Sequence, residues 1–172
     1  MTAATASIRF TRFRGFTLVE ALVAVSIIAI LAMIAVPSIQ ERIVREQVVE
    51  AAKLADEVVK GPIAKYWRAN GEMPADNATA EVPVPEKIVG NFVSAITVED
   101  GAVHITFGNN ANGSIKGRTL SLRPAVVADT PEVPPAWVCA FGGKVPDKMT
   151  VQGRDRTDLD NRYLPVNCRR LS

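Results

Sequence analysis

The sequence has few residues of the kinds that build catalytic or metal sites. Its 172 residues include one histidine, His104, and two cysteines, Cys139 and Cys168. No Cys-x-x-Cys spacing and no Gly-x-Ser-x-Gly motif occurs. The residue types therefore predict neither a zinc site nor the nucleophile of a common class of secreted hydrolase. We expect a protein that is not an enzyme and that holds no metal and no cofactor.

Acidic residues are missing from the N-terminal end, where Arg9, Arg12 and Arg14 lie. Lysine and arginine beside a membrane segment stay on the cytoplasmic side, so we expect this end to remain inside the cell. The chain has a formal charge of +2, and without residues 1–15 it keeps 17 basic residues against 18 acidic ones. This balance does not predict a general nucleic-acid binder.

One long apolar run follows, residues 16–39, and Glu20 is its only charged residue. As a helix of about 1.5 Å per residue it is about 36 Å long, enough to cross a hydrocarbon core of about 30 Å. A secretory signal peptide is the competing interpretation. Its apolar region is shorter and has no carboxylate, and the best cleavage site here, residues 36–38, is a weak one. The run is better explained as a segment that stays in the membrane.

Residues 40–70 continue as a helix with one apolar and one charged face. Pro37 predicts a kink, Gly61-Pro62 predicts a second bend, and Asn70-Gly71 predicts the end of the helix. The apolar face holds Val44, Val48, Ala51, Ala52, Ala55, Val58, Val59, Ile63 and Trp67.

Short β-prone runs follow a loop at residues 71–87, and they are residues 91–98, 102–107, 119–123 and 136–141. Asp100-Gly101 predicts a hairpin between the first two runs, and residues 124–135, with four prolines, predict an extended loop. Val103, Ile105 and Phe107 alternate onto the face that packs on the helix, which places His104 on the outer surface. Few periodic signals follow Gly142. The pattern predicts an α+β fold.

The two cysteines form an even pair in a chain with an export-like N-terminus. This favours a disulfide between Cys139 and Cys168 over the alternative of two free, buried thiols.

Residues 15–20 read GFTLVE, and a basic leader precedes them. This junction resembles the class III signal of type IV pilins and related pseudopilins. The resemblance implies that a prepilin peptidase cuts between Gly15 and Phe16 and methylates the new amine of Phe16. It also implies that Glu20 pairs with the Phe16 amine of a neighbouring subunit. The alternatives are a Glu20 that reaches the membrane interface or is protonated. Pro37 matches the proline that pilins carry 22 residues into the mature chain.

The C-terminal half is similar to the globular domain of type IVa major pilins, most clearly in WVC at residues 137–139 and YLPVNCR at residues 163–169. The resemblance implies a pilin fold: a leader, residues 1–15; a membrane and polymerisation helix, residues 16–39; an amphipathic helix, residues 40–70; and a head, residues 71–172, with a disulfide loop at residues 139–168. It implies a precursor in the bacterial inner membrane. Identical subunits then form an extracellular helical filament with the type IV pilus assembly machinery.

The resemblance implies adhesion, twitching motility and, less directly, DNA uptake. One alternative is a type II secretion pseudopilin. The other is a minor, DNA-binding pilin, because basic residues exceed acidic ones by three within and just after the disulfide loop. We expect a mixed, solvated loop rather than a DNA site, and we give the glycosylation patterns at Asn77 and Asn112 little weight.

Overall fold

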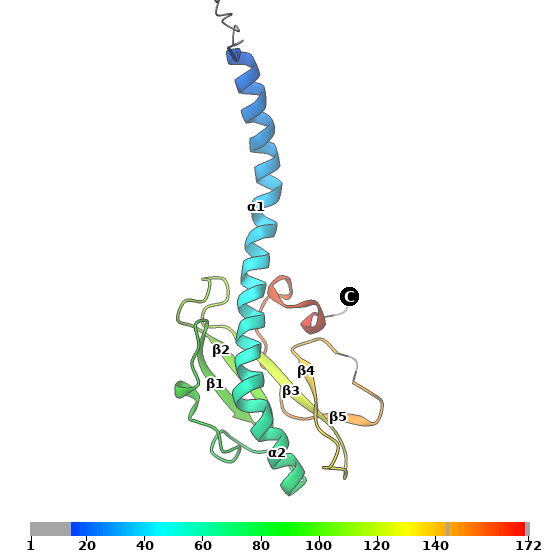
Figure 1. Ribbon diagram of the computed structural model, residues 1–172. Helices are drawn as coiled ribbons and strands as arrows, with labels where there is room; N and C mark the ends of the chain where they lie inside the picture. The colour runs from blue at the N-terminus through cyan, green and yellow to red at the C-terminus, as the bar shows by residue number, and fades with distance from the viewer. Residues whose placement is uncertain (1–14, 144, 171–172) are drawn as a thin grey trace, which may run out of the picture. The chain divides into compact units, whose positions relative to one another are not determined.

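The computed structural model describes residues 15–143 and 145–170, without the side chains of residues 36–38. The chain divides into two compact units, Met1–Ser38 and Ile39–Ser172. The first contains the apolar part of helix α1 (Leu18–Ala55), and the second contains the rest of α1 and all later elements (Figure 1). The predicted leader lies outside the described residues except for Gly15. The predicted kink falls on Pro37, whose side chain is also outside them.

In the second unit α1 continues into a π-helical turn, Asp56–Lys60, and then into α2, Gly61–Asn70. The buried face of this helical stretch agrees with the predicted apolar stripe. Gly71 ends α2 in the left-handed conformation (φ 71°), and its N–H donates to the carbonyl of Trp67 at 2.8 Å, as is common at a helix C-terminus. The buried residues of the face are Val44, Val48, Ala51, Ala55, Val59, Ile63 and Trp67.

The π turn explains how this face stays buried over its whole length. From Ala51 to Trp67 the buried residues are spaced by four each time. Four such steps in an ideal helix of 3.6 residues per turn would rotate the stripe by about 160°. A π turn bonds i to i+5 and so advances less per residue, which returns Ile63 and Trp67 to the core. It also suits Pro62, which has no N–H for the bond to residue 58. The helix thus changes type directly before Gly61-Pro62, where the sequence predicts a bend.

The helix packs on a five-stranded antiparallel sheet in the order β1-β2-β3-β4, with β5 also on β3. Leu122 pairs with both Val103 of β2 and Cys139 of β4, and Ala125 pairs with both β4 and β5. Strands β2 and β5 therefore lie along one edge of β3, and β4 lies along the other. The strands are β1 (Val93–Glu99), β2 (Ala102–Phe107), β3 (Thr119–Val127), β4 (Ala136–Cys139) and β5 (Met149–Val151).

Two features of the sheet differ from the sequence prediction. Residues 124–127, expected in a loop, extend β3, because Ala125, Val126 and Val127 pair with β5. Pro124 has no N–H to give, but its carbonyl still accepts the N–H of Gln152 at 2.8 Å. Strand β5 was not predicted, since three residues are too short to show an alternation.

The turn between β1 and β2 and the inner face of β2 agree with the prediction. Asp100 and Gly101 both have positive φ, 48° and 77°, which is the conformation of a type I′ hairpin. Val103, Ile105 and Phe107 are buried in the core that faces the helix. The predicted α+β fold is confirmed.

The outer face of the sheet is covered where it was expected to be open. Residues 153–158, which we call the strap, lie against β2 and β3. The N–H of Ser121 donates to Thr157 Oγ1 at 3.0 Å, and the N–H of Arg156 donates to Ser121 Oγ at 2.8 Å. The prediction that His104 is a surface residue was wrong. Its side chain points outward from β2, but the strap leaves it only 3% exposed.

Asn77 also lies in the interior rather than in an accessible loop. Its side-chain amide donates to the carbonyls of Pro83 and Ile96, and its oxygen accepts the N–H of Val98 at 2.7 Å. A side chain used in this way joins the segment before β1 to the strand itself. It is not free for a glycan.

Candidate functional site

The first residues that the structure describes set the start of α1. Gly15, Phe16 and Thr17 precede the helix, which begins at Leu18. The hydroxyl oxygen of Thr17 accepts the backbone N–H of Glu20 at 3.3 Å, so Thr17 is the N-cap. The carboxylate of Glu20 lies in the first turn, where the partial positive charge of the helix terminus stabilises an anion.

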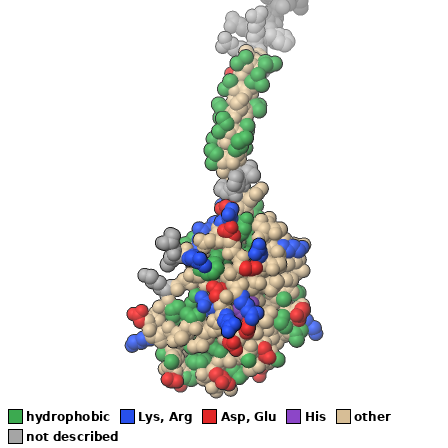
Figure 2. Space-filling view, turned by 180° about the vertical axis from the view of Figure 1, so that it is seen from behind, with side chains coloured by type: hydrophobic (Ala, Val, Ile, Leu, Met, Phe, Trp, Pro, Cys, Tyr) green, Lys and Arg blue, Asp and Glu red, His purple; other side chains and the backbone are tan. Residues whose placement is uncertain are grey.

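The large apolar side chains of the N-terminal part of α1 are exposed among the residues that the structure describes. Burying one large apolar side chain is worth about 1.5–3 kcal/mol. Burying all the exposed large apolar side chains of this segment is therefore worth on the order of 20 kcal/mol. By length and composition the segment can cross a membrane. Figure 2 shows hydrophobic side chains along it and charged ones over the second unit. Within residues 16–39 the large apolar residues that are more than half exposed are Phe16, Leu18, Val19, Leu22, Val23, Val25, Ile27, Ile28, Ile30, Leu31, Met33, Ile34 and Ile39.

Polar groups within this segment are satisfied locally. Ser26 donates its hydroxyl hydrogen to the carbonyl of Leu22 at 2.7 Å, a bond from i to i−4 that needs no outside partner. Glu20 is different, because no hydrogen bond or ion pair of its carboxylate is found among the residues that the structure describes. It is the one charged residue of the segment.

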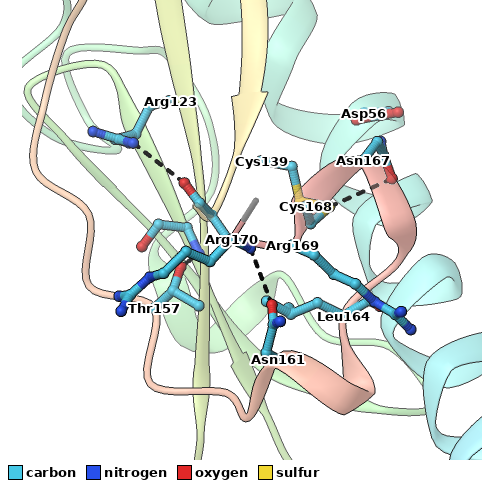
Figure 3. Close-up of a disulfide and its surroundings, with 12 residues drawn as sticks. Asp56, Arg123, Cys139, Thr157, Asn161, Leu164, Asn167, Cys168, Arg169 and Arg170 are labelled. Carbon is cyan, nitrogen blue, oxygen red and sulfur yellow. Dashed lines mark hydrogen bonds between the residues drawn. A yellow bond between two sulfur atoms is a disulfide. The ribbon is translucent and has the colours of Figure 1, made fainter. Parts of the chain in front are cut away.

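The C-terminal part of the head is closed by a disulfide between Cys139, the last residue of β4, and Cys168 in the 3-10 turn Val166–Cys168 (Figure 3). The two Cα atoms lie 4.7 Å apart. Next to the bridge the N–H of Phe141 donates to the carbonyl of Cys168 at 3.2 Å. At Gly142 a Cβ atom would lie 2.0 Å from the carbonyl oxygen of Asn167. The two chain segments are thus in direct backbone contact.

The arginines of this region do not form one cationic surface. Arg156 pairs with Glu99 at 2.6 Å, and Arg162 pairs with Asp160 at 3.0 Å. Hydrogen bonds from Arg162 hold the pKa of the Asp160 carboxyl below its usual range. Arg170 stacks over Phe141, 4.6 Å from the ring centre, and Arg169 points to the other side in Figure 3. Most of these charges already have partners within the head.

Sequence reasoning missed two features near these sites. The first is the capping role of Thr17, although the spacing Thr17-x-x-Glu20 is that of a capping box and was available as a signal. The second is the strap and the buried side chains under it, His104 and Ser121. Their alternation along the strands indicates an outer face, and no local pattern indicates that a segment more than thirty residues later covers it.

The N-terminal segment matches a family model described as a prokaryotic N-terminal methylation motif, over residues 10–36. A second model, described as pilin (bacterial filament), matches residues 44–169. The chain belongs to the pilin family. The resemblance seen at residues 15–20 and in the C-terminal half is thereby confirmed, and so is the pilin fold with its Cys139–Cys168 disulfide.

Curated pilins resemble the chain over nearly its full length. A fimbrial protein of Neisseria meningitidis is 34% identical, with 91% of this chain and 94% of the relative covered. A type IV major pilin protein of Neisseria gonorrhoeae is 33% identical over 91% of this chain and 87% of its own. A fimbrial protein of Eikenella corrodens is 30% identical over 91% and 90%. This pilin is a structural subunit of a pilus, a filament assembled from identical copies.

Proposed function

We propose that this pilin is the major subunit of a type IV pilus and that its first 15 residues are a leader. A prepilin peptidase cuts between Gly15 and Phe16 and methylates the Phe16 amine. Support comes from the N-terminal methylation motif at residues 10–36 and from a cleavage point that precedes the first helical residue, Leu18. A peptide bond outside the helix is accessible to a peptidase without unwinding.

Residues 16–39 hold the precursor in the inner membrane and then pack with the same segment of other subunits. The observation that carries this proposal is the exposure of the large apolar side chains in this segment, whose one charged residue is Glu20. Residues 40–70 and 71–172 lie outside the membrane and form the filament surface. Assembly replaces lipid contacts by helix contacts, which gives little net driving force. The type IV pilus assembly machinery therefore supplies the direction.

In the filament Glu20 pairs with the Phe16 amine of a neighbouring subunit. A charge well inside a membrane costs about 2.5–3.5 kcal/mol on insertion scales, so an unpaired Glu20 would be costly in the apolar filament core as well. The pair forms in one register, which makes Glu20 a sensor of correct docking. Pro37 removes one backbone hydrogen bond from α1 and lets the helix adjust near its exit from the apolar layer.

The variant Glu20→Gln tests the pairing. We expect the variant to be cut and held in the membrane at normal levels but to give few or no surface filaments. Glu50→Gln is the matched control, since Glu50 is an exposed residue of the same helix outside the apolar segment, and it should give normal filaments. Normal piliation of the Glu20→Gln variant would contradict the proposed pairing.

Mass spectrometry of sheared filaments tests the processing and the abundance. We expect one dominant protein that begins at methylated Phe16 and has oxidised cysteines. A mature chain found free in the periplasm and starting beyond Ser38 would contradict the membrane-held precursor. A minor component of the filament would favour the minor pilin, and a chain found only with a secretion system would favour the pseudopilin.

The filament serves adhesion and twitching motility, which is supported by the relatives named type IV major pilin and fimbrial protein. DNA uptake is the less supported activity, because Arg156 and Arg162 are paired within the head. Replacing Arg154, Arg156 and Arg162 by glutamine should leave uptake unchanged. A strong loss of uptake with normal piliation would show DNA binding by this loop.

A further inference from the structure

A buried polar cluster lies between the sheet and the strap, away from the N-terminal segment. His104 of β2 is 3% exposed and Ser121 of β3 is fully buried. His104 Nδ1 lies 2.9 Å from Ser121 Oγ, and the N–H of Arg156 in the strap donates to the same Oγ at 2.8 Å. The hydroxyl of Ser121 is therefore the link between the histidine and the strap.

The hydrogen-bond donors around Ser121 Oγ indicate which protonation state of His104 suits this cluster. A hydroxyl has one hydrogen to donate, and Ser121 Oγ already accepts from Arg156. The arrangement that satisfies both groups has Ser121 donating to Nδ1, with the imidazole neutral and its hydrogen on Nε2. Nε2 then faces Glu99 Oε2 at 3.5 Å. Within the part of the chain that the structure describes, neither of these two buried atoms has a hydrogen-bond partner.

A second proton on the imidazole would turn Nδ1 into a donor. The hydrogen of Ser121 would then have no acceptor among the described residues, which is costly for a buried hydroxyl. The charged groups around the ring are Glu99 from β1, Asp155 and Arg156 from the strap, and Arg123 from β3, which lies 3.9 Å from Asp155. Glu99 and Asp155 would attract the imidazolium, but each is close to an arginine of its own.

We propose that His104 and Ser121 form a pH-sensitive latch, which holds the strap on the sheet at neutral pH and releases it when His104 is protonated. Release would let Ser121 reach water and would move the Arg156 guanidinium away from the imidazolium. In agreement with the geometry, burial and the nearby Arg156 lower the pKa of His104 from its ordinary value. The strap lies inside the disulfide loop, so the latch would change part of the head surface while the fold remains closed by Cys139–Cys168.

Amide hydrogen exchange of the full-length chain in detergent micelles, measured by NMR between pH 7.5 and 4.5, tests the latch. The two reporters are the amides of Arg156 and Ser121, whose bonds join strap and sheet. After correction for the intrinsic rate at each pH, we expect their protection to fall about tenfold with acidification, as suits the loss of one buried hydrogen bond. The amide of Ala140 donates to the carbonyl of Ser121 at 2.8 Å and should keep its protection.

Two variants separate the latch from general acid effects. His104→Asn can still accept the Ser121 hydroxyl but does not titrate, so its strap should stay protected across the range. Ser121→Ala lacks the link, so the Arg156 amide should be poorly protected at every pH. Unchanged protection of Arg156 in the native chain would overturn the proposal. An equal fall in the protection of Arg156 in His104→Asn would also overturn it, because the effect would then come from Glu99 or Asp155. An equal fall in the protection of Ala140 would overturn it too, because the sheet itself would then open.

Discussion

Removing the disulfide should cost a large part of the stability of the head. Cys139 and Cys168 are 29 residues apart in the sequence, and in the chain-entropy model a loop of about 30 residues is worth about 3.6 kcal/mol at 25 °C. Replacing both cysteines by alanine avoids a free thiol. We expect the free energy of unfolding to fall by about 3–4 kcal/mol, because the unfolded chain regains the freedom that the bridge removes.

Guanidinium denaturation of the full-length chain in a nonionic detergent measures this loss. Trp137 in β4 and Trp67 in α2 report on the two sides of the core by fluorescence. Val166→Ala is the matched control, since Val166 lies two residues from Cys168 and its side chain is 76% exposed. It should change the unfolding free energy by less than about 0.5 kcal/mol.

A loss below about 1 kcal/mol would refute the entropic reasoning. It would mean that the C-terminal segment is held mainly by its buried residues, Leu159 and Leu164, and that the unfolded chain is already compact. A different result is an unchanged denaturation midpoint in Trp67 fluorescence with a transition at lower guanidinium concentration in Trp137 fluorescence. It would show that the C-terminal segment detaches locally while the helix and inner sheet stay folded.

Three further predictions concern single sites. Gly142→Ala should destabilise the head by about 1–3 kcal/mol through overpacking against the Asn167 backbone in chemical denaturation, whereas Gly113→Ala, with nothing within 4 Å of the added carbon, should be nearly neutral. Asn77→Ala should cost about 1–3 kcal/mol because the buried N–H of Val98 loses its acceptor, and the exposed Asn110→Ala is its control. The lowered pKa of His104 means that below its ordinary value of 6.5 the unfolded chain binds a proton that the folded chain does not. The melting temperature should therefore fall as the pH drops below 6.5, and less so in His104→Asn.

The sequence was sufficient for elements that depend on local signals. The apolar run, the helical stripe from Val44 to Trp67, the hairpin at Asp100-Gly101 and the helix end at Gly71 each follow from spacing or from one turn residue. The disulfide could be predicted because only one pairing of two cysteines exists.

The remaining features depend on contacts between distant residues. Strand β5 and the extension of β3 stabilise each other, so neither is visible in its own short segment. The burial of His104 on β2 comes from the strap, which bonds to Ser121 of β3 and Glu99 of β1, the strands on either side of β2. Thr17 is the exception, because its spacing to Glu20 is a local signal that identifies the N-cap.

The π turn at Asp56–Lys60 has a consequence for how the chain tolerates changes in length. A turn that bonds i to i+5 contains one residue more than an α-helical turn needs. Deleting a residue there can restore ordinary helix, whereas a deletion elsewhere between Val44 and Ala55 must misplace every buried side chain on one side of it. This short stretch is therefore where the long helix can lose a residue at the least structural cost.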